Sequence, residues 1–421
     1  MEKHDAVEIV KEKIEGPQIK NFGDFWRFFR SELKPRGPIF TPFNIISAPV
    51  ILIGLVLIVY RFAVGLGATT NLSQEFPWGM WIGFDVIVGV AFAGGGYALA
   101  FIVYILGVEK WRPILRATVL NAFLAYVFYA GAIILDIGRW WNAPNPFLGR
   151  GFGVSSVMFI VAWHFLLYML TLGIEFSPAV PEWLGMKKLR KILGSLTLGA
   201  VVFGVMLSIH HQSGLGALFA MAKGKIHPLW YSEFIPVIFF ISSIYSGLSL
   251  VIFEGTISHK VFESQIDEEH HHAYPDILVG LAKTCAGVMF AVFFLDLFMV
   301  HHDGELRLLS TPMGYWYLTE VLGLLLLPCF LYIHGAQTRN LAFIRVAAVL
   351  ALIGIVLNRL NIVFIAYNWY VPLEQRYYPY WMEIWVTLTI IFIEIWVFRW
   401  IINRMPVMRK SPEWARALEK H

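Results

Sequence analysis

The stretch from Ser208 to Phe219, SIHHQSGLGALF, places two histidines and a glutamine at the end of a long apolar run. Imidazole rings ligate haem or metal ions, or exchange protons near neutral pH, and a glutamine amide orients a polar ligand. The segment is therefore compatible with haem ligation, metal binding, quinone binding or a solvated helix end. The other polar groups of the chain must decide among these.

A second set of reactive side chains is ionisable and lies inside apolar segments. Charged groups in a bilayer are costly, so each is a functional candidate, although structural ion pairs between helices are an equal alternative. Asp136 and Arg139 are one helical turn apart and are expected to pair. We expect one outer cavity to be surrounded by Arg61, Asp85, Asp136, Arg139, His210, His211, Glu320 and Arg359.

The elements that carry these residues are apolar segments of membrane-spanning length. Hydrophobic residues make up 58% of the 421-residue chain and charged residues 15%, which is untypical of a soluble domain. A helix needs about 20 mainly apolar residues to cross a bilayer. We predict an all-α polytopic membrane protein with about ten transmembrane helices, at 44–67, 78–107, 114–138, 155–175, 192–212, 231–256, 277–300, 315–334, 343–368 and 380–402.

The distribution of positive charge predicts the orientation. Most of the 33 lysines and arginines fall on the two tails and on alternate connections, so both termini are expected in the cytoplasm. This bias also explains the slightly positive net charge, and nothing indicates binding to nucleic acid. The tail 1–43 contains an amphipathic helix, which we expect on the inner membrane surface or on a soluble partner.

A weak internal repeat predicts how the helices are grouped. The sequence LDIGRWW ends the third predicted span, and FLDLFMVHH ends the seventh. We therefore expect two four-helix bundles, at about 78–212 and 231–368, with flanking helices, in a transmembrane domain of residues 44–402. A second cytoplasmic tail follows at 403–421.

The residue types favour quinone chemistry over the other candidates. Interconversion of a quinone and a quinol moves two electrons and two protons, so its site needs hydrogen-bonding groups and a group that titrates near neutrality. Asp85, His211 and Gln212 provide that combination. Cys285 and Cys329 are isolated on separate spans and form no cluster-binding or zinc motif. We therefore expect no metal, haem or iron–sulfur cluster in this chain.

Six motifs in register resemble one family of membrane proteins. They are TPFN (41–44), FPWGMWIGFD (76–85), LDIGRWWN (135–142), HHQSGLGALF (210–219), HPLW (227–230) and IFEG (252–255). Together they resemble the NrfD/polysulfide reductase membrane-subunit family over nearly the whole chain. The nearest branch resembles the HybB-type hydrogenase subunits and the Hmc and Dsr transmembrane complexes.

The resemblance implies a haem-free subunit of a prokaryotic cell membrane that binds menaquinone. It implies electron exchange with a ferredoxin-like iron–sulfur subunit on the outer face, often with a multihaem cytochrome c nearby. Asp85 and His211 match the quinone site as catalytic residues, and Gln212, Trp78 and Arg61 are assigned to quinone binding. HybB-type members tend to have a glutamate at the position of Ile160, and this departure favours a Dsr-like or Hmc-like assembly.

The resemblance also implies proton movement, for which Glu254 matches a family acid. With it we assign to a proton path Asp136, Arg139, His164, His210, Asp296, Glu320 and Arg359. Two other functions stay open. In a haem b cytochrome, His210 or His211 would pair with His301 or His302, and His164 with His334. A secondary transporter would use the buried charges and the repeat.

Overall fold

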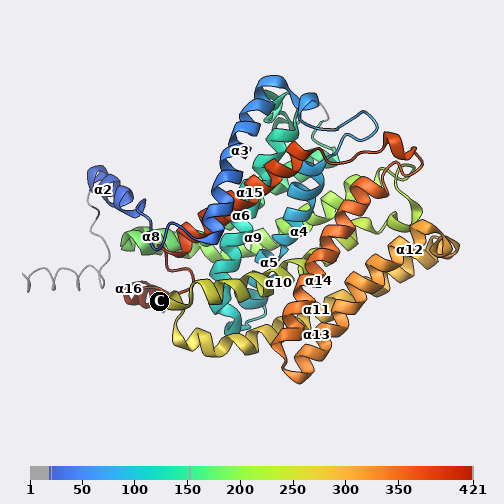
Figure 1. The fold of residues 1–421 in the computed structure, drawn as a ribbon. Coiled ribbons are helices and arrows are strands. Elements are labelled where there is room, and N and C mark those ends of the chain that lie inside the picture. Colours follow the sequence, from blue (N-terminus) through green and yellow to red (C-terminus); the bar gives the residue numbers. More distant parts are fainter. Residues whose placement is uncertain (1–18, 20, 151–152, 420–421) are drawn as a thin grey trace, which may run out of the picture.

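The computed structural model describes residues 19, 21–150 and 153–419, and part of the predicted 1–43 tail lies outside them. Ten helices in this part of the chain are long and apolar enough to cross a membrane, which confirms the predicted fold class and number of spans. One isolated bridge, between Ile226 and Tyr367, is the only β-pairing of the described residues. Figure 1 shows the resulting arrangement of tilted helices.

Five of the spans are built from more than one helical segment, one of them because the 3₁₀ helix η4 (Glu109–Trp111) precedes α6. The other five are single helices, and α2 (Phe22–Glu32) and α16 (Glu413–Glu419) lie outside the spans. The first five spans are, in order, α3 (Pro42–Val64); the second span Trp81–Ile105, which consists of π-helical η2 (Trp81–Val88), α4 (Gly89–Phe92), α5 (Gly94–Ala100) and π-helical η3 (Phe101–Ile105); α6 (Arg112–Asp136, extended at its start to Glu109); α7 (Val157–Phe176) with α8 (Ala179–Leu184); and α9 (Lys187–Ala220).

The sixth and seventh spans are α10 (Ile235–Val261) and α11 (Glu268–His302). The eighth consists of α12 (Pro312–Leu318), π-helical η10 (Thr319–Leu326) and α13 (Leu327–Thr338), the ninth of α14 (Leu341–Leu360) and π-helical η11 (Asn361–Ile365), and the tenth is α15 (Trp381–Ile402).

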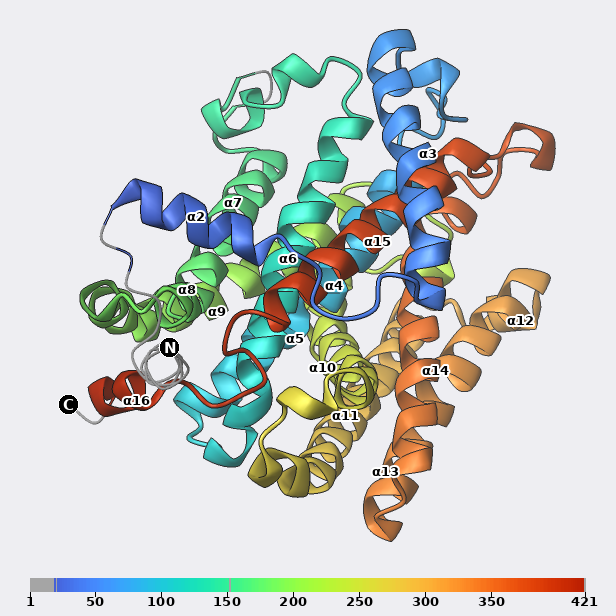
Figure 2. The same cartoon turned by 60° about the vertical axis from the view of Figure 1, so that its left-hand side comes forward.

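The spans contact one another in two closed rings of four. In the first ring α5, α6, α7 and α9 contact their neighbours in turn, and in the second α10, α11, α13 and α14 do so. Helix α10 also packs on α5 and α9, which joins the rings. Helices α3 and α15 lie side by side on the first ring, as both views show (Figures 1 and 2). These contacts fit the predicted bundles, whose limits stay a prediction.

The rings meet where glycines let two backbones touch. A Cβ atom on Gly247 of α10 would lie 1.8 Å from the backbone nitrogen of Gly95, and one on Gly94 would lie 2.2 Å from the carbonyl oxygen of Ser243. Such distances are far below van der Waals contact, so only glycine fits. We call Gly94, Gly95 and Gly247 the glycine seam.

Helix α9 extends further than predicted, which changes the position of the His-His-Gln stretch. The predicted span ended at residue 212, whereas α9 continues to Ala220. Residues 213–220 contain no proline, and Gly216 allows close contact with the start of α10, where an added Cβ would lie 2.7 Å from the Cα of Pro236. His211 and Gln212 therefore lie about two turns before the end of α9, and both side chains are buried in the protein.

Helix α2 confirms the helical part of the predicted amphipathic segment. Asn21 caps its start by accepting a hydrogen bond from the backbone of Asp24 over 2.9 Å. Phe28 packs on Trp183 of α8 with 5.1 Å between ring centroids, and Phe29 lies 6.4 Å from Trp400 of α15. The apolar side of α2 thus rests partly on the ends of two spans.

Candidate functional site

Asp85 lies within the π-helical start of the second span and is fully buried. Thr387 of α15 donates a hydrogen bond to its Oδ2 over 3.1 Å, whereas Oδ1 has no hydrogen-bond partner in the structure. A buried carboxyl oxygen without a partner is unfavourable unless a ligand, a water molecule or a proton satisfies it. The free Oδ1 atom of Asp85 is therefore a candidate contact for a ligand, and its catalytic role stays a prediction.

His211 lies on the inward face of α9 and is 1% exposed. Its Nδ1 atom shares a hydrogen bond of 2.8 Å with the hydroxyl of Tyr126 on α6. The ring also packs against Phe165 of α7, at 5.6 Å between centroids. Because Tyr126 engages Nδ1, the Nε2 atom is the ring position left to meet a ligand.

Gln212 joins α9 directly to the span that carries Asp85. Its Nε2 atom donates to the carbonyl oxygen of Val90 over 2.8 Å, and Val90 follows Asp85 by little more than one helical turn. Trp78, just before this span, packs on Phe219 of α9 at 5.2 Å and on Tyr367 at 5.8 Å. The structure thus brings Gln212 against the Asp85 span and Trp78 against α9, while His211 contacts α6 and α7.

Arg61 binds backbone carbonyls at the end of α6, and its assignment to quinone binding stays a prediction. Its guanidinium donates from Nε to the carbonyl of Leu135 over 2.7 Å and from Nη2 to that of Ile137 over 2.8 Å. These carbonyls are at the end of α6, where a helix leaves acceptors without partners. Arg61 therefore clamps α3 to the end of α6, beside Asp136.

The predicted pair of Asp136 and Arg139 is wrong. Helix α6 ends at Asp136, and Ile137 is extended, so the chain leaves the helix before one further turn is completed. Arg139 is exposed, and the Oδ1 atom of Asp136 has no hydrogen-bond partner. The charges that act on Asp136 are Glu383 and Arg61.

Glu320 and Arg359 form a separate polar group in the second ring. Glu320 accepts hydrogen bonds from Trp230, Asn358 and Asn361 at 2.9, 2.6 and 2.6 Å. Arg359 donates to Asn358 and Ser242, each over 2.6 Å, and its guanidinium lies 3.7 Å from the ring centroid of Phe239. These contacts are separate from those of Asp85 and His211. The eight residues that were predicted to surround one outer cavity therefore do not form a single hydrogen-bonded network.

The remaining residues of the predicted proton path are Asp296, His164, His210 and Glu254. Asp296 and Glu320 both line a small cavity in the second ring, together with Trp230 and Tyr317. His210 is exposed, lies about 100° around α9 from His211, and its ring is 5.1 Å from that of His164. Glu254 borders a different cavity, near the other end of α10.

Three groups that contact the candidate site or the start of its span were not assigned to it from the sequence. Tyr126 and Thr387 contact His211 and Asp85, but nothing in the sequence links residues so far apart. Glu383 accepts hydrogen bonds from the hydroxyl of Tyr377 over 2.6 Å and from the backbone of Met80 over 3.3 Å, so it ties α15 to the start of the second span. Its position inside an apolar segment was the one available signal.

The HPLW motif (227–230) lies in the connection between α9 and α10. His227 Nδ1 accepts a hydrogen bond from the backbone of Leu229 over 3.2 Å, and the ring packs on Trp369 at 4.9 Å. Burial lowers the pKa of His227 below its ordinary value. His227 is therefore a neutral structural cap at neutral pH.

Comparison with known proteins identifies the family of this arrangement. The family model described as polysulphide reductase, NrfD, matches residues 68–371, which is more than half of the chain. The chain belongs to the NrfD family. The match includes Asp85, His211, Gln212 and the second ring, whereas α3 and α15 lie outside it.

Individual relatives of this NrfD protein cover most of its length. A protein of Nitratidesulfovibrio vulgaris is 43% identical over 90% of this chain and 97% of its own. A probable Ni/Fe-hydrogenase 2 b-type cytochrome subunit of Escherichia coli is 31% identical over 86% of this chain and 91% of its own. The menaquinone reductase integral membrane subunit of N. vulgaris is 27% identical over 71% of this chain and 75% of its own.

Proposed function

We propose that this NrfD protein is the integral membrane subunit of a multi-subunit menaquinone/menaquinol oxidoreductase in a prokaryotic cell membrane. The subunit binds menaquinone as an exchangeable substrate and contains no redox cofactor of its own. Electrons pass between the quinone and an iron–sulfur subunit on the outer face, with multihaem cytochrome c and other redox subunits in a Dsr-, Hmc- or Hyb-like complex. The family match and the name of the menaquinone reductase relative support this proposal.

The observation that carries the proposal is the meeting of α9 and the second span. Gln212 bonds to Val90, while Asp85 on the same span keeps one carboxyl oxygen without a partner. A quinone oxygen needs a donor during reduction, and each reduced oxygen also needs a proton. His211 and Asp85 supply these functions, and Gln212 holds the two helices in register.

The test is quinone-dependent electron transfer in the assembled complex with Asp85→Asn or His211→Ala. Losing a buried hydrogen bond to the ligand costs about 1–3 kcal/mol, which corresponds to roughly a 5- to 150-fold weaker interaction. We expect at least a tenfold lower turnover in both variants. His210→Ala is the matched control, because its ring faces away, and it should lose less. Normal turnover in both assembled variants would place the quinone elsewhere.

A haem b cytochrome is the second candidate, since one relative is named as a b-type cytochrome subunit. The predicted histidine pairs have other neighbours here: His211 contacts Tyr126 and Phe165, whereas His302 contacts Phe234 and Phe298. We expect the purified subunit, freed from cytochrome partners, to show no b-type band after reduction with dithionite. Stoichiometric haem in that sample would establish the cytochrome.

Energy conservation is a further part of the proposal. The acids that line cavities beside α10, namely Glu254, Asp296 and Glu320, are positioned to carry protons, and the competing interpretation is that they only hold helices together. The two interpretations are distinguished by measuring proton movement in proteoliposomes that contain the complex with Glu254→Gln. We expect this variant to lose charge movement while part of the quinone chemistry remains, and unchanged proton uptake would favour the structural interpretation.

A further inference from the structure

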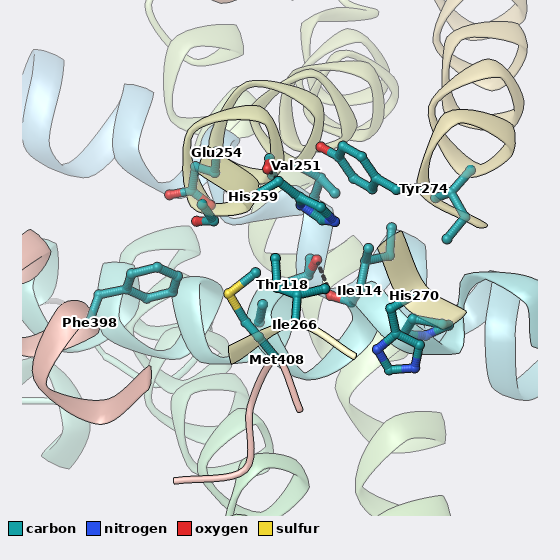
Figure 3. A pocket seen from close by; sticks show the side chains of 15 residues that line it. Ile114, Thr118, Val251, Glu254, His259, Ile266, His270, Tyr274, Phe398 and Met408 are labelled. Carbon is teal, nitrogen blue, oxygen red and sulfur yellow. Dashed lines mark hydrogen bonds between the residues drawn. The ribbon is translucent and has the colours of Figure 1, made fainter. Parts of the chain in front are cut away.

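A cavity between spans of the first ring gathers arginines at the end that the charge distribution predicts to be cytoplasmic. Its volume is about 390 Å³, whereas the cavity lined by Glu254 and His259 (Figure 3) has about 40 Å³. Its walls are η3, the start of α6, the end of α7 and the start of α9. Because each of these segments is the end of a span, the cavity is expected at the depth of lipid headgroups. We call it the arginine cavity.

Three arginines line the arginine cavity. Nη1 of Arg116 and Nε of Arg190 both donate to Glu182 of α8, each over 2.6 Å. One carboxylate balances only one of these two charges, so the group keeps an excess positive charge. The third arginine, Arg112, lines the cavity from the start of α6 and pairs with Glu109. Guanidinium groups bind phosphate through two parallel hydrogen bonds, so this wall suits a phosphate.

One acid lines the same cavity without a partner. Glu175 lies near the end of α7, and its Oε1 atom is buried and has no hydrogen-bond partner among the described residues. A buried carboxyl oxygen without a partner is unfavourable, and a ligand that donates a hydrogen bond would satisfy it. The arginine cavity therefore offers guanidinium groups to an anion and a carboxyl group to a cation.

Helix α9 connects the arginine cavity to the apolar outer surface of the spans. Leu198 lines the cavity and is 58% exposed, and Val202, one turn further along α9, is 54% exposed. Ile105, beside Tyr104 of the η3 wall, is exposed as well. Exposed apolar side chains on a span contact acyl chains, so a headgroup in the cavity can keep its chains in the bilayer. Basic pockets between transmembrane helices bind lipid headgroups in this way.

We propose that the arginine cavity binds the headgroup of a membrane phospholipid that has a phosphate and a primary ammonium group, as phosphatidylethanolamine does. The phosphate lies against Arg112, Arg116 and Arg190, the ammonium group donates to Glu175, and the acyl chains leave along Leu198. A phosphatidylglycerol headgroup would leave the acid without a cation, and a choline headgroup has no N–H to donate. The proposal is independent of the quinone function, since the candidate quinone site contains none of these residues.

The test is lipid binding to the purified complex, measured by native mass spectrometry with dilauroyl lipids of three headgroups. We expect the tightest site to bind the ethanolamine lipid about tenfold more strongly than the choline or glycerol lipid, because only the ethanolamine headgroup satisfies both walls. Equal affinity for the three lipids would overturn the proposal without any variant. Soluble glycerophosphoethanolamine at the same concentration should not displace the lipid, and displacement would show a site for a free polar molecule instead.

Matched variants assign the binding to the cavity. Glu175→Gln keeps the size of the side chain and removes its charge, so affinity for the ethanolamine lipid should fall about fivefold while that for the glycerol lipid does not fall. Arg112→Gln should weaken both. Lys110→Gln is the control, because this neighbouring cation is exposed and does not line the cavity. An unchanged headgroup preference in Glu175→Gln, or an equal loss in Lys110→Gln, would overturn the proposal.

Discussion

At the scale of single residues, Asp85 and His211 are each oriented by a hydroxyl group from another helix. Thr387 donates to the carboxylate, and Tyr126 shares a hydrogen bond with the imidazole. Both side chains are buried, so the single contact decides which polar atom is left for a ligand. Tyr126 is therefore expected to position His211 without touching the quinone itself.

The variant Tyr126→Phe tests this positioning role. It removes the 2.8 Å hydrogen bond to Nδ1 and leaves the ring packing intact, so we expect about a tenfold lower kcat, with a shifted pH profile of turnover. Tyr97→Phe is the matched control, since the Tyr97 hydroxyl bonds to Ser243 at 2.9 Å. A normal pH profile and normal kcat in Tyr126→Phe would show that the hydroxyl has only a structural role.

At the scale of the elements, helix irregularity coincides with the buried polar groups. Asp85 lies in η2, Glu320 in η10 and Asn361 in η11, and all three segments are π-helical. Such segments are often found at functional sites, because the extra residue in the turn redirects side chains. The irregular segments of the second and eighth spans therefore position the polar groups of the two rings.

The glycine seam is the element-scale feature most sensitive to mutation. In Gly247→Ala the added Cβ would overlap the backbone of Gly95, which no rotamer change relieves. We expect poor assembly and a melting temperature lower by several degrees, in a thermal stability assay of the detergent-solubilised complex. Gly287→Ala on α11 is the control, because its Cβ would meet nothing within 4 Å. Equal stability of the two variants would contradict the close backbone contact.

The sequence predicted the spans well and their contacts poorly, for different physical reasons. Bilayer thickness imposes long apolar runs, and these are visible without any tertiary information. Helix ends are less visible, since α9 continues past residue 212 and α11 begins at Glu268, within a polar segment. Side-chain partners are invisible when they are far apart in the chain: Thr387 and Asp85 are separated by 302 positions.

The candidate site was likewise predicted only in part, because local helix geometry can be read from the sequence and long-range contacts cannot. Helix geometry turns successive residues by about 100°, so His210 and His211 cannot both face inward, and in the structure His211 is buried and His210 exposed. The role of Arg61 did not follow, because its partners are backbone carbonyls at the end of another helix. The roles proposed for Asp85, His211 and the proton path stay predictions.

At the scale of the whole molecule, the feature of most consequence is the orientation in the membrane. The charge distribution predicts that both termini and the cavity lined by Glu254 face the cytoplasm, and that the connections after α6 and α9 face outward. An iron–sulfur partner is then expected over these outer connections, close to the Asp85 region.

Cysteine labelling in intact cells tests this orientation. We expect an impermeant thiol reagent to modify Asn142→Cys and Lys223→Cys from outside, and Lys188→Cys only after the membrane is opened. The natural Cys285 and Cys329 are both 0% exposed and should give little background. Labelling of Lys188→Cys alone in intact cells would reverse both the orientation and the expected docking face.

The glycine seam also limits how this protein can move. Where two backbones touch without intervening side chains, sliding one helix by a single residue, about 1.5 Å, drives its carbonyl groups into the other chain. Shear between packed helices depends on side chains that can adjust, and the seam has none. The two rings are therefore mechanically one block. For the proposed redox function we therefore expect events at one end to reach the other as displaced charge or relayed protons, without the rocking of halves on which alternating-access carriers depend.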